Sequence, residues 1–556
     1  MSESRGGETP YDHIVVGAGS AGAVIAARLT QDPDVTVLLL EAGPADRNLF
    51  IRMPAGIETL LNNRWCNWNY MTEPQAALDG RRLWTPRGKV LGGSSSINGM
   101  VYIRGNALDY DRWSQRGAVG WSYEDVLPYF RRLENHADRH DDYHGDSGPV
   151  RVVTGKCENP LTQAFIEAGL QAGYPYTPDV NGHRQEGIGR YDMNVDRGRR
   201  ASSAFAYLRP AMARRNLTVA TGALAERIVF ERGVARGVAY LRNGRRETAY
   251  AAREIVLSAG AINTPQLLLA SGVGPADALR RLGAAVVADV PQVGSNLQDH
   301  VEVLVGYRCL KPISLYRETR PWRKALIGAQ WLANRTGPAA TNHYEAGGFI
   351  RSMAGIEYPD IQLHFIPMGV NDPVRRTAVE HGFKVHVGTM RSESRGTVTL
   401  RSLDLREPPA IDPNYMSTED DWRGMRASIR LAREILTQPA LKDFRGAEVL
   451  PGPGVETQAE IDGFIRARAN TAYHPSGTCR MGSDDGSVVD PQCRVRGVGG
   501  LRVADASIMP GIVTGNLNVP TMMIGEKVSD LIAGKSLPPA APAMPFIAAD
   551  WRQAQR

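Results

Sequence analysis

The chain has 556 residues, of which 42% are hydrophobic and 22% are charged, values typical of a globular protein. This length exceeds what one hydrophobic core usually organises, so two domains or one large interrupted domain are expected. No run of 18 apolar residues occurs, and the chain does not open with a basic segment followed by an apolar one. Neither a membrane span nor a secretory signal is therefore expected.

The charge distribution argues against a nucleic-acid-binding protein, and the cysteine content argues against a disulfide-stabilised one. The formal net charge is +6, but the basic residues come in short groups, as in residues 197–200, without interleaved aromatic residues. Solvated surface arginines are favoured over nucleic-acid binding, while a weak attraction to anionic membrane surfaces stays open. The five cysteines are dispersed and lack Cys-x-x-Cys spacing. This pattern argues against a disulfide scaffold or a structural metal site and suits a reducing, cytoplasmic compartment.

The most informative local pattern lies near the start of the chain. Residues 12–41 read as a strand, a Gly-x-Gly-x-x-Gly turn, an apolar helix and a second strand that ends in an acid. Gly17 permits the tight turn, Gly19 lets the backbone approach a pyrophosphate, and Gly22 lets the helix pack closely on the strand. Glu41 follows Gly22 by 19 residues and can accept hydrogen bonds from ribose hydroxyls. This unit predicts an adenine-dinucleotide site rather than an ordinary glycine turn.

Two segments have the composition of ligand-contacting loops. The irregular segment 42–85 contains an aromatic cluster with Trp65 and Trp68, which is typical of a lid or binding segment. Residues 88–99 are rich in glycine and serine, which supply backbone and hydroxyl donors for a phosphate-bearing ligand. The apolar residues of this second segment, Val90 among them, argue against a freely moving linker.

The remaining chain divides into recognisable regions. Residues 217–257 alternate like antiparallel strands, and Thr264 is expected to cap a short buried helix. Residues 302–470 carry strands and helices without ligand motifs, as a separate substrate-facing domain would. From Leu537 the composition turns to proline and alanine, which predicts a tail.

The last informative block, residues 473–526, supplies polar side chains. The block contains His474, a strand is expected to end at Asp505, and an apolar helix is expected to begin at residues 520–521. The N-terminus of that helix could polarise a ligand.

These blocks together resemble the glucose–methanol–choline (GMC) oxidoreductase family. Residues 88–111 match its first signature, residues 260–274 match its second, and residues 291–300 also agree with the family pattern. The resemblance covers about residues 10–535. It implies an α/β fold, with a Rossmann-like FAD-binding domain and a discontinuous antiparallel-sheet (α+β) substrate-binding domain, and it implies FAD rather than NAD as cofactor.

The resemblance also implies how the domains divide the chain. The FAD-binding domain would comprise residues 10–155, 201–301 and 471–535. The substrate-binding domain would comprise residues 156–200 and 302–470, with tails at residues 1–9 and 536–556.

Carried over residue by residue, the resemblance assigns FAD contacts to the glycine turn, the glycine–serine segment and the C-terminal block. The contacts it implies are Gly17, Gly19, Ser20, Ala21, Gly22, Glu41, Ala42, Arg87, Val90, Gly92, Gly93, Ser94, Asn98, Gly99, Met100, Val101, Ala225, Asp505, Ala506, Asn516, Pro520 and Thr521. Members that link FAD covalently carry a histidine where this chain has Ile97. Dissociable FAD is therefore expected.

The family resemblance implies that His474 and Asn518 form the catalytic pair. Hydride transfer from an alcohol needs a base for the hydroxyl proton, and imidazole has a pKa close to working pH. An amide N–H can stabilise the developing alkoxide without a competing charge. A core histidine with a satisfied partner is the alternative for His474 taken alone. His300 either lines the site or bonds the backbone.

Within the family, the stretches 96–109, 342–351 and 386–396 resemble the members that oxidise choline to betaine aldehyde. A quaternary ammonium offers no hydrogen-bond donor, so aromatic faces and a carboxylate are its suitable partners. The aromatic candidates and the carboxylate candidate are Trp65, Trp68, Tyr344, Tyr473 and Glu345. Each of them could equally be a core or surface residue.

Two alternatives stay open at this point. The same signatures serve dehydrogenases or oxidases of uncharged aliphatic or aromatic primary alcohols, and the family includes FAD-containing hydroxynitrile lyases. Either dioxygen or a quinone could accept the electrons. The resemblance favours a quinone or another membrane acceptor, so a cytoplasmic protein attached peripherally to the inner face of the membrane is conceivable.

Overall fold

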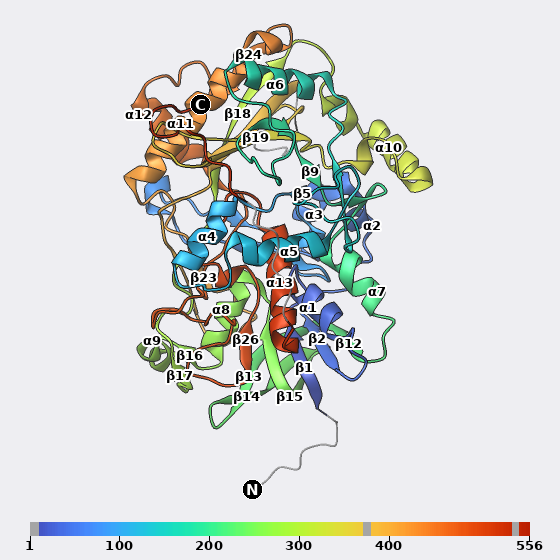
Figure 1. Ribbon diagram of the computed structural model, residues 1–556, viewed down its shortest axis with the longest axis vertical. Helices are drawn as coiled ribbons and strands as arrows, with labels where there is room; N and C mark the ends of the chain where they lie inside the picture. The colour runs from blue at the N-terminus through green and yellow to red at the C-terminus, as the bar shows by residue number, and fades with distance from the viewer. Residues whose placement is uncertain (1–9, 371–377, 379, 536–543) are drawn as a thin grey trace.

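The computed structural model describes residues 10–370, 378, 380–535 and 544–556. The chain forms two parts stacked along the long axis of the molecule, each built around its own seven-stranded sheet (Figure 1). Each sheet packs into a separate large cluster of buried apolar side chains. The expected tail at residues 1–9 lies outside the described residues, as do residues 536–543 of the other tail.

The first sheet has the strand order β12-β2-β1-β15-β14-β13, with β26 also paired to β15. Its centre is parallel: β1 pairs with β2 and β15, β2 with β12, and β15 with β26. β13, β14 and β15 form an antiparallel extension. The strands are β1 (Tyr11–Val16), β2 (Val37–Glu41), β12 (Leu217–Thr221), β13 (Ala223–Glu231), β14 (Val234–Arg242), β15 (Arg245–Leu257) and β26 (Leu501–Val503).

The antiparallel pairing predicted for residues 217–257 is wrong for the first strand of that segment, because β12 pairs parallel with β2. Side-chain alternation reports which face of a strand is buried, and a half-buried strand alternates in either direction. Strand direction was therefore not contained in the pattern.

Close backbone packing sets the position of α1 (Gly22–Leu29) between the first sheet and α13 (Asn518–Ala533). A Cβ on Gly22 would lie 1.9 Å from the carbonyl oxygen of Gly17, so only glycine fits there. On the other side of α1, a Cβ on Gly525 of α13 would lie 2.9 Å from the carbonyl oxygen of Ala21. All but one of the α1 residues are buried, as expected of a helix covered on two sides.

The second sheet is antiparallel, with the order β24-β18-β21-β20-β19-β8 and β25 paired to β18. Its strands are β8 (Gly187–Arg190), β18 (Val301–Cys309), β19 (Ala346–Ile350), β20 (Ile361–Ile366), β21 (Gly382–Thr389), β24 (Arg445–Leu450) and β25 (Asn470–Thr471). The helices that pack against it are α6 (Pro160–Gln171), α11 (Glu419–Leu436) and α12 (Gln458–Arg468).

The two faces of the second sheet have different roles. Val303, Leu363 and Val385 alternate into the apolar core shared with α6, α11 and α12. His364 and His386 are direct cross-strand partners, and residues of the same parity point to the opposite face. That face carries the polar side chains of the site described below.

Strands of the two sheets interleave along the chain. The first sheet draws on residues 11–41, 217–257 and 501–503, and the second draws on residues 187–190, 301–389 and 445–471. The domain prediction contains an interleaving of this kind, and its boundaries stay a prediction.

Shorter elements complete the described chain. The remaining helices are α2 (Leu49–Arg52), α3 (Ile57–Leu61), α4 (Ala107–Gln115), α5 (Tyr123–Leu133), α7 (Arg209–Ala211), α8 (Gly260–Ala270), α9 (Ala276–Arg281) and α10 (Pro321–Asn334). The remaining strands are β3 (Tyr70–Met71), β4 (Trp84–Thr85), β5 (Val101–Tyr102), β6 (Glu134–His136), β7 (Val150–Thr154), β9 (Asp192–Met193), β10 (Val195–Asp196), β11 (Arg199–Arg200), β16 (Val273–Gly274), β17 (Ala288–Asp289), β22 (Thr397–Thr399) and β23 (Ala410–Asp412).

Two local expectations need correction. Thr264 does not cap a helix, because α8 begins four residues earlier, and its hydroxyl donates to Asp505 instead. Residues 544–556 of the expected tail contact the upper part: Arg351 donates to the carbonyl of Ala554, and Arg556 forms an ion pair with Glu434. Among the described residues, none of the helices combines the length and apolarity needed to cross a bilayer.

Candidate active site

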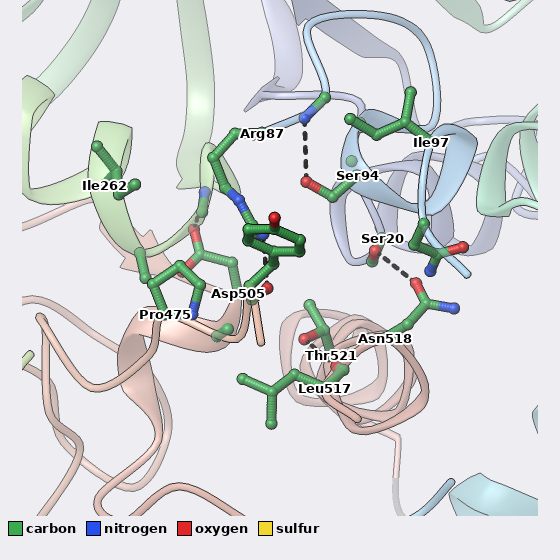
Figure 2. Close-up of a pocket in the computed structure, with 18 of the residues that line it drawn as sticks. Ser20, Arg87, Ser94, Ile97, Ile262, Pro475, Asp505, Leu517, Asn518 and Thr521 are labelled. Carbon is green, nitrogen blue, oxygen red and sulfur yellow. Dashed lines mark hydrogen bonds between the residues drawn. The ribbon is translucent and has the colours of Figure 1, made fainter. Parts of the chain in front are cut away.

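A cavity of about 340 Å³ is walled by residues from both parts of the molecule. The lower part contributes the glycine turn, the glycine–serine segment and the start of α13 (Figure 2). The upper part contributes side chains from β18, β20 and β21, and residues 472–475 form another part of the wall. A ligand in this cavity would contact both sheets.

Glycines allow backbone segments at the lower end of the cavity to pack closely on one another. Gly17 has φ +97°, and a Cβ there would lie 2.5 Å from the carbonyl oxygen of Ser258. A Cβ on Gly93, which also has positive φ, would lie 2.8 Å from the Cα of Gly19. The glycine turn and the glycine–serine segment therefore approach each other more closely than side chains would allow.

Glu41 closes this end of the cavity at the end of β2. Its carboxylate accepts hydrogen bonds from the backbone N–H groups of Ala18 (3.0 Å) and Gly43 (2.8 Å), which fix its orientation. Burial raises the pKa of Glu41 to about 7, against the lowering effect of those two N–H groups. A pair of ribose hydroxyls is a suitable additional donor for this carboxylate.

The opposite end of the cavity contains His474, which a strained turn presents to it. Tyr473 has φ +67°, a left-handed conformation that is unusual for a bulky residue. The backbone N–H of His474 donates to the buried carboxylate of Asp299 at 2.7 Å. Arg87 donates to the carbonyl of Tyr473, so both sides of the turn are fixed.

A chain of hydrogen bonds determines which nitrogen of His474 carries the proton. His300 Nε2 lies 3.0 Å from the carbonyl oxygen of Met390, which can only accept, so His300 carries its proton on Nε2. His300 Nδ1 is then an acceptor, and it lies 3.0 Å from Nδ1 of His474. His474 therefore donates from Nδ1, and its Nε2 carries the lone pair and is an acceptor.

Asn516 provides the partner of that lone pair. Its Nδ2 lies 3.2 Å from Nε2 of His474, and its Oδ1 lies 3.2 Å from Nε2 of Gln362 and 3.4 Å from Nε2 of His364. Both ends of the amide are thus assigned by their neighbours. Mainly through burial, and also through the nearby positive charge of Arg87, the pKa of His474 is held well below its usual value. The imidazole is neutral and able to accept a proton at neutral pH.

Asn518, the catalytic asparagine predicted from the sequence, lies elsewhere. Its Oδ1 accepts a hydrogen bond from Ser20 at 2.9 Å, at the glycine turn (Figure 2). Its Nδ2 is buried and has no hydrogen-bond partner among the described residues. Asn518 is the first residue of α13, whereas Asn516 precedes the helix, so their side chains reach different ends of the cavity. The place beside His474 therefore belongs to Asn516.

The carboxylate next to His474 in the cavity wall is that of Glu302. The sequence predicted Glu345 as the carboxylate partner of an ammonium group, and the position of Glu345 does not support that prediction. Glu345 lies outside the cavity wall, where its carboxylate accepts from the backbone N–H of Cys157 (2.7 Å) and the hydroxyl of Thr341 (2.6 Å). Glu302 lines the cavity and lies 2.7 Å from Nδ1 of His386. Burial alone would raise the pKa of Glu302, but His386 outweighs this effect and the pKa lies below its usual value.

Aromatic side chains surround the same region. Tyr344, Tyr473 and Trp68 line the cavity, as predicted candidates for an ammonium site would. Trp65 does not line the cavity, and half of its surface is exposed to solvent. His300 stands behind His474 rather than in the wall.

Comparison with known proteins agrees with this arrangement. The GMC oxidoreductase family model matches residues 11–302 with its N-terminal part and residues 392–525 with its C-terminal part, which together are more than half of the chain. This chain belongs to the GMC oxidoreductase family. The resemblance inferred from the sequence motifs is confirmed, and the chain is an oxidoreductase.

Individual relatives of this GMC oxidoreductase are similar over nearly the full length. The oxygen-dependent choline dehydrogenase of Burkholderia cenocepacia is 52% identical over 550 residues, which is 98% of this chain and 97% of the relative. The crystal structure of pyridoxine 4-oxidase from Mesorbium loti is 32% identical with a TM-score of 0.86, and covers 95% of this chain and 100% of that one. The formate oxidase of Aspergillus oryzae, whose FAD is described as modified, is 27% identical with a TM-score of 0.89, and covers 95% and 99%.

The residues at the lower end of the cavity fit an FAD cofactor. The buried, partnerless Nδ2 of Asn518 needs an acceptor, and a pyrophosphate or flavin oxygen would satisfy it. Gly17, Gly19 and Gly93 line the cavity, so no side chain at these positions separates a ligand from the protein backbone. Ile97 lines the cavity and offers no nucleophilic atom for a covalent link.

Most of the predicted contact residues line one cavity. Those predicted for FAD and found in its wall are Gly17, Gly19, Ser20, Ala21, Glu41, Ala42, Arg87, Gly93, Ser94, Asn98, Gly99, Met100, Val101, Ala225, Asp505, Ala506, Asn516 and Thr521. Those outside the wall are Gly22, Val90, Gly92 and Pro520, which pack behind it. Glu302, His364 and His386 line the cavity but were not predicted as site residues, because the pairing of β18, β20 and β21 brings them together.

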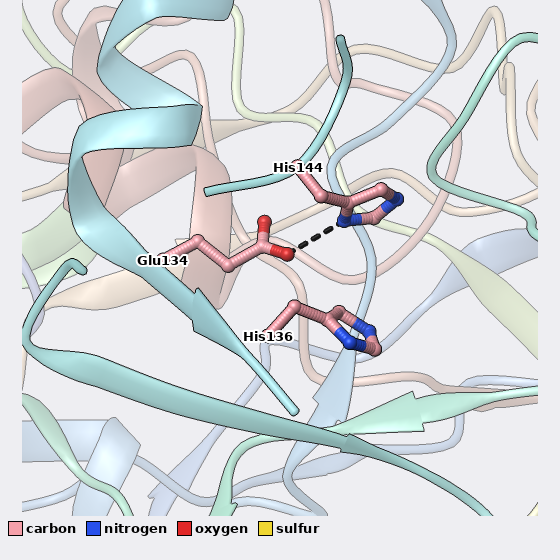
Figure 3. Close-up of side chains that lie close together, drawn as sticks. All are labelled: Glu134, His136 and His144. Carbon is pink, nitrogen blue, oxygen red and sulfur yellow. Dashed lines mark hydrogen bonds and ion pairs between the residues drawn. The ribbon is translucent and has the colours of Figure 1, made fainter. Parts of the chain in front are cut away.

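A second cluster of titratable side chains lies apart from the cavity. Glu134, His136 and His144 bring potential metal ligands within 4.8 Å of one another (Figure 3). Glu134 forms an ion pair with Arg104, and His144 bridges Glu134 (2.6 Å) and Asp179 (2.8 Å). His136 accepts from the backbone N–H of Asp138 at Nδ1, and its Nε2 lies 3.4 Å from the carboxylate of Asp192. We interpret the cluster as a buried ion-pair network that joins β6 to the loop that follows it.

Proposed function

We propose that this GMC oxidoreductase binds FAD without a covalent link and oxidises choline, a primary alcohol, to betaine aldehyde. The observation that carries the proposal is the hydrogen-bond chain from Met390 through His300 to His474, which leaves Nε2 of His474 as an acceptor at the cavity. When bound, FAD supplies the hydride acceptor at its N5 atom. The residues of the chain supply the base, the orientation of the alcohol and an environment from which water is excluded.

His474 and Asn516 have different roles at the hydroxyl group of the alcohol. Nε2 of His474 accepts the hydroxyl proton, while the Nδ1–H bond to His300 holds the ring in the required tautomer. Asn516 donates from Nδ2 to the oxygen as negative charge develops on it. Burial lowers the pKa of His300 to about 3, so His300 stays neutral and keeps its acceptor role.

Glu302 and the aromatic residues around it would hold the quaternary ammonium. The pKa of Glu302 lies below its usual value, so the side chain is a carboxylate at neutral pH. Tyr344 and Tyr473 present rings to the same part of the cavity, and such faces attract cations that lack hydrogen-bond donors. The 52% identity to a choline dehydrogenase supports the same substrate.

A second candidate is the oxidation of uncharged primary alcohols. His386 already pairs with Glu302 at 2.7 Å, so the carboxylate is not without a partner. The 32% identical structural neighbour is named for pyridoxine, a substrate of a different kind. This candidate uses the same base and the same amide donor.

Anaerobic reduction of the bound flavin tests the proposal. The purified holoenzyme is mixed with choline or with its uncharged isostere 3,3-dimethylbutan-1-ol, and the loss of oxidised-flavin absorbance is followed. Choline should reduce the flavin with a second-order rate constant at least about tenfold higher, the equivalent of about 1.4 kcal/mol. Equal rate constants favour the second candidate, and the absence of bleaching with any alcohol contradicts alcohol oxidation altogether.

Electron transfer out of the reduced flavin is a separate half-reaction. The relative from Burkholderia cenocepacia is named oxygen-dependent, which supports dioxygen, whereas a quinone is the acceptor that the family resemblance implies. Mixing the anaerobically reduced enzyme with dioxygen or with a soluble quinone in a stopped-flow instrument distinguishes them by the rate of flavin reoxidation.

A further inference from the structure

The cavity face of the second sheet pairs a carboxylate with an imidazole. Glu302 of β18 and His386 of β21 both line the cavity, and Nδ1 of His386 lies 2.7 Å from Oε1 of Glu302. Their side chains are 20% and 21% exposed, so both groups can exchange protons with solvent in the cavity. Either the neutral imidazole or the imidazolium can donate such a hydrogen bond. Both protonation states of His386 are therefore compatible with the pair.

The register of the sheet brings these two side chains together. Glu302 lies directly opposite Gly388, and His386 lies two residues before Gly388 on the same strand. Residues two apart on a strand point to the same face, so Glu302 and His386 are diagonal neighbours on the cavity face. On the other side of β21, His364 of β20 is the direct partner of His386. His386 thus lies between a carboxylate and a second imidazole.

Several titratable groups beside this pair are uncharged between pH 5.5 and pH 7. Burial lowers the pKa of His364 to about 4 and holds that of His474 well below its usual value, so both imidazoles are neutral in this range. Burial raises the pKa of Tyr344 and of Tyr473, so both phenols are neutral as well. The ring centroid of Tyr344 lies 6.2 Å from that of His386. None of these four groups changes its charge near His386 in this range.

The charged groups around the pair keep their charge over the same range. Glu302 is ionised, because its pKa lies below the usual value. Burial lowers the pKa of Lys384, on the same strand, to about 8, against the opposing charges of Glu58 and Glu302. Its Nζ donates to the carbonyl of Gly369, and it stays a cation below pH 7. Among the described residues around Glu302, His386 is therefore the group whose charge can change between pH 5.5 and pH 7.

We propose that His386 is a specificity-determining residue: a quaternary ammonium binds at Glu302 only when His386 is neutral, and its binding releases one proton from the imidazolium form to solvent. An imidazolium and an ammonium held against the same carboxylate would repel each other at short distance. The other carboxylates of the cavity wall are engaged elsewhere, since Glu41 accepts from backbone N–H groups at the glycine turn and Asp505 accepts from Gly260. The inference rests on the proposed function, which places the ammonium group at Glu302.

The protonation state of His386 would also select between the two classes of alcohol considered above. With an imidazolium, the pair has no net charge and accepts an uncharged alcohol. With a neutral imidazole, the pair is negative and favours a cation. The ratio of kcat/KM for choline to that for 3,3-dimethylbutan-1-ol should therefore rise with pH in the wild type and stay constant in His386→Gln.

Calorimetric titration of the holoenzyme with tetramethylammonium tests the proposal without any turnover, because this cation has no hydroxyl group to oxidise. Titrations in buffers of different ionisation enthalpy count the protons that binding releases. The wild type should release a substantial fraction of one proton at pH 5.5 and less at pH 7. Its dissociation constant should be at least about threefold higher at pH 5.5, as expected when a proton and a cation compete for one site.

Two histidine variants assign the proton. His386→Gln stays uncharged and can still donate to Glu302, so its dissociation constant should change less than about twofold with pH and no proton should be released. His381→Gln is the matched control, because His381 bonds Ser314 outside the cavity wall, and it should behave like the wild type. Flavin content confirms that each protein retains FAD.

The outcomes separate this inference from the proposed function. Tetramethylammonium binding without proton release, the same pH dependence in His386→Gln as in the wild type, or no binding of tetramethylammonium would each overturn the inference. Failure of choline to reduce the flavin contradicts the proposed oxidation instead. Rapid flavin reduction by choline together with binding that releases no proton would leave the oxidation intact and remove the role of His386.

Discussion

Two asparagines separated by one residue have different predicted effects on catalysis. Asn516 donates toward His474 Nε2, whereas Asn518 bonds Ser20 at the glycine turn. We expect Asn516→Ala to slow flavin reduction by about 10²–10³-fold, the usual cost of one lost oxyanion donor. We expect Asn518→Ala to weaken FAD binding and to change the reduction rate of the remaining holoenzyme less than tenfold. Rapid-reaction kinetics and flavin content measure the two effects, and a reversed pattern would return the catalytic role to Asn518.

The sequence predicted the kinds of group at the site, a histidine base with an asparagine amide, better than it predicted which asparagine and which carboxylate lie there. His474, taken from the family pattern as the catalytic base, lines the cavity, and its catalytic role stays a prediction. Asn516 and Asn518 differ only in whether they precede or begin α13, and helix boundaries are uncertain by a few residues when inferred from sequence. Glu302 was missed because its position follows from the register of β18 against β21, which no local pattern specifies.

Close packing of α1 against α13 gives a prediction at the element scale. A Cβ on Gly525 would lie 2.9 Å from the carbonyl oxygen of Ala21 and 3.0 Å from Cβ of Val24, so Gly525→Ala forces the two helices apart. We expect it to lower the free energy of unfolding by about 1–3 kcal/mol and to weaken FAD retention.

Gly463→Ala is the matched control for this substitution. Gly463 lies in α12 with no atom within 4 Å of an added Cβ among the described residues, so alanine should be neutral or stabilising by up to about 1 kcal/mol. Thermal unfolding of both variants checks the pair. Equal effects of the two substitutions would contradict the packing argument.

Elements with a local signal were predicted well. The strand–turn–helix–strand unit from β1 to β2 is present, because its glycines and apolar runs depend on local geometry. The direction of β12 and the start of α8 were not predicted, because the first depends on its neighbour β2 and the second on Asp505, 245 residues distant from Gly260 in the chain. Contacts between residues distant in the chain cannot be predicted from a short stretch of sequence.

Buried neutral histidines make the whole molecule sensitive to acid. Burial lowers the pKa of His300 to about 3 and of His364 to about 4, and it lowers that of His474 well below its usual value. Between pH 6.5 and about 4, these three histidines bind protons in the unfolded chain but stay neutral in the folded chain. The free energy of unfolding therefore falls as the pH falls. Glu41 opposes this, since burial raises its pKa to about 7 and it binds its proton earlier in the folded state.

For these four groups the net difference is about two protons, which corresponds to a contribution of about 3 kcal/mol per pH unit between pH 6 and pH 5. Chemical denaturation at several pH values and a fixed FAD concentration measures this slope. His364→Asn should reduce it by about 1.4 kcal/mol per pH unit, since one of the protons is removed. A stability that is flat between pH 7 and pH 5 would contradict the assignment of neutral histidines.

Family and fold class were predictable for the molecule as a whole, and both predictions are confirmed. Several motifs in the right order specify a family even when each motif alone is ambiguous. The packing of residues 544–556 onto the upper part was not predictable, because the contacts depend on Arg351 and Glu434, which are distant in the chain.

Recognition of the ammonium group by Glu302 is tested most directly by the kcat/KM values for choline and 3,3-dimethylbutan-1-ol in the wild type and in Glu302→Gln, with Glu345→Gln as control. If Glu302 holds the ammonium group, Glu302→Gln should lower kcat/KM for choline by at least about a hundredfold and change the value for the uncharged isostere less than threefold. Glu345→Gln should not alter the ratio of the two values. Equal losses for both substrates in Glu302→Gln would contradict choline recognition at this carboxylate.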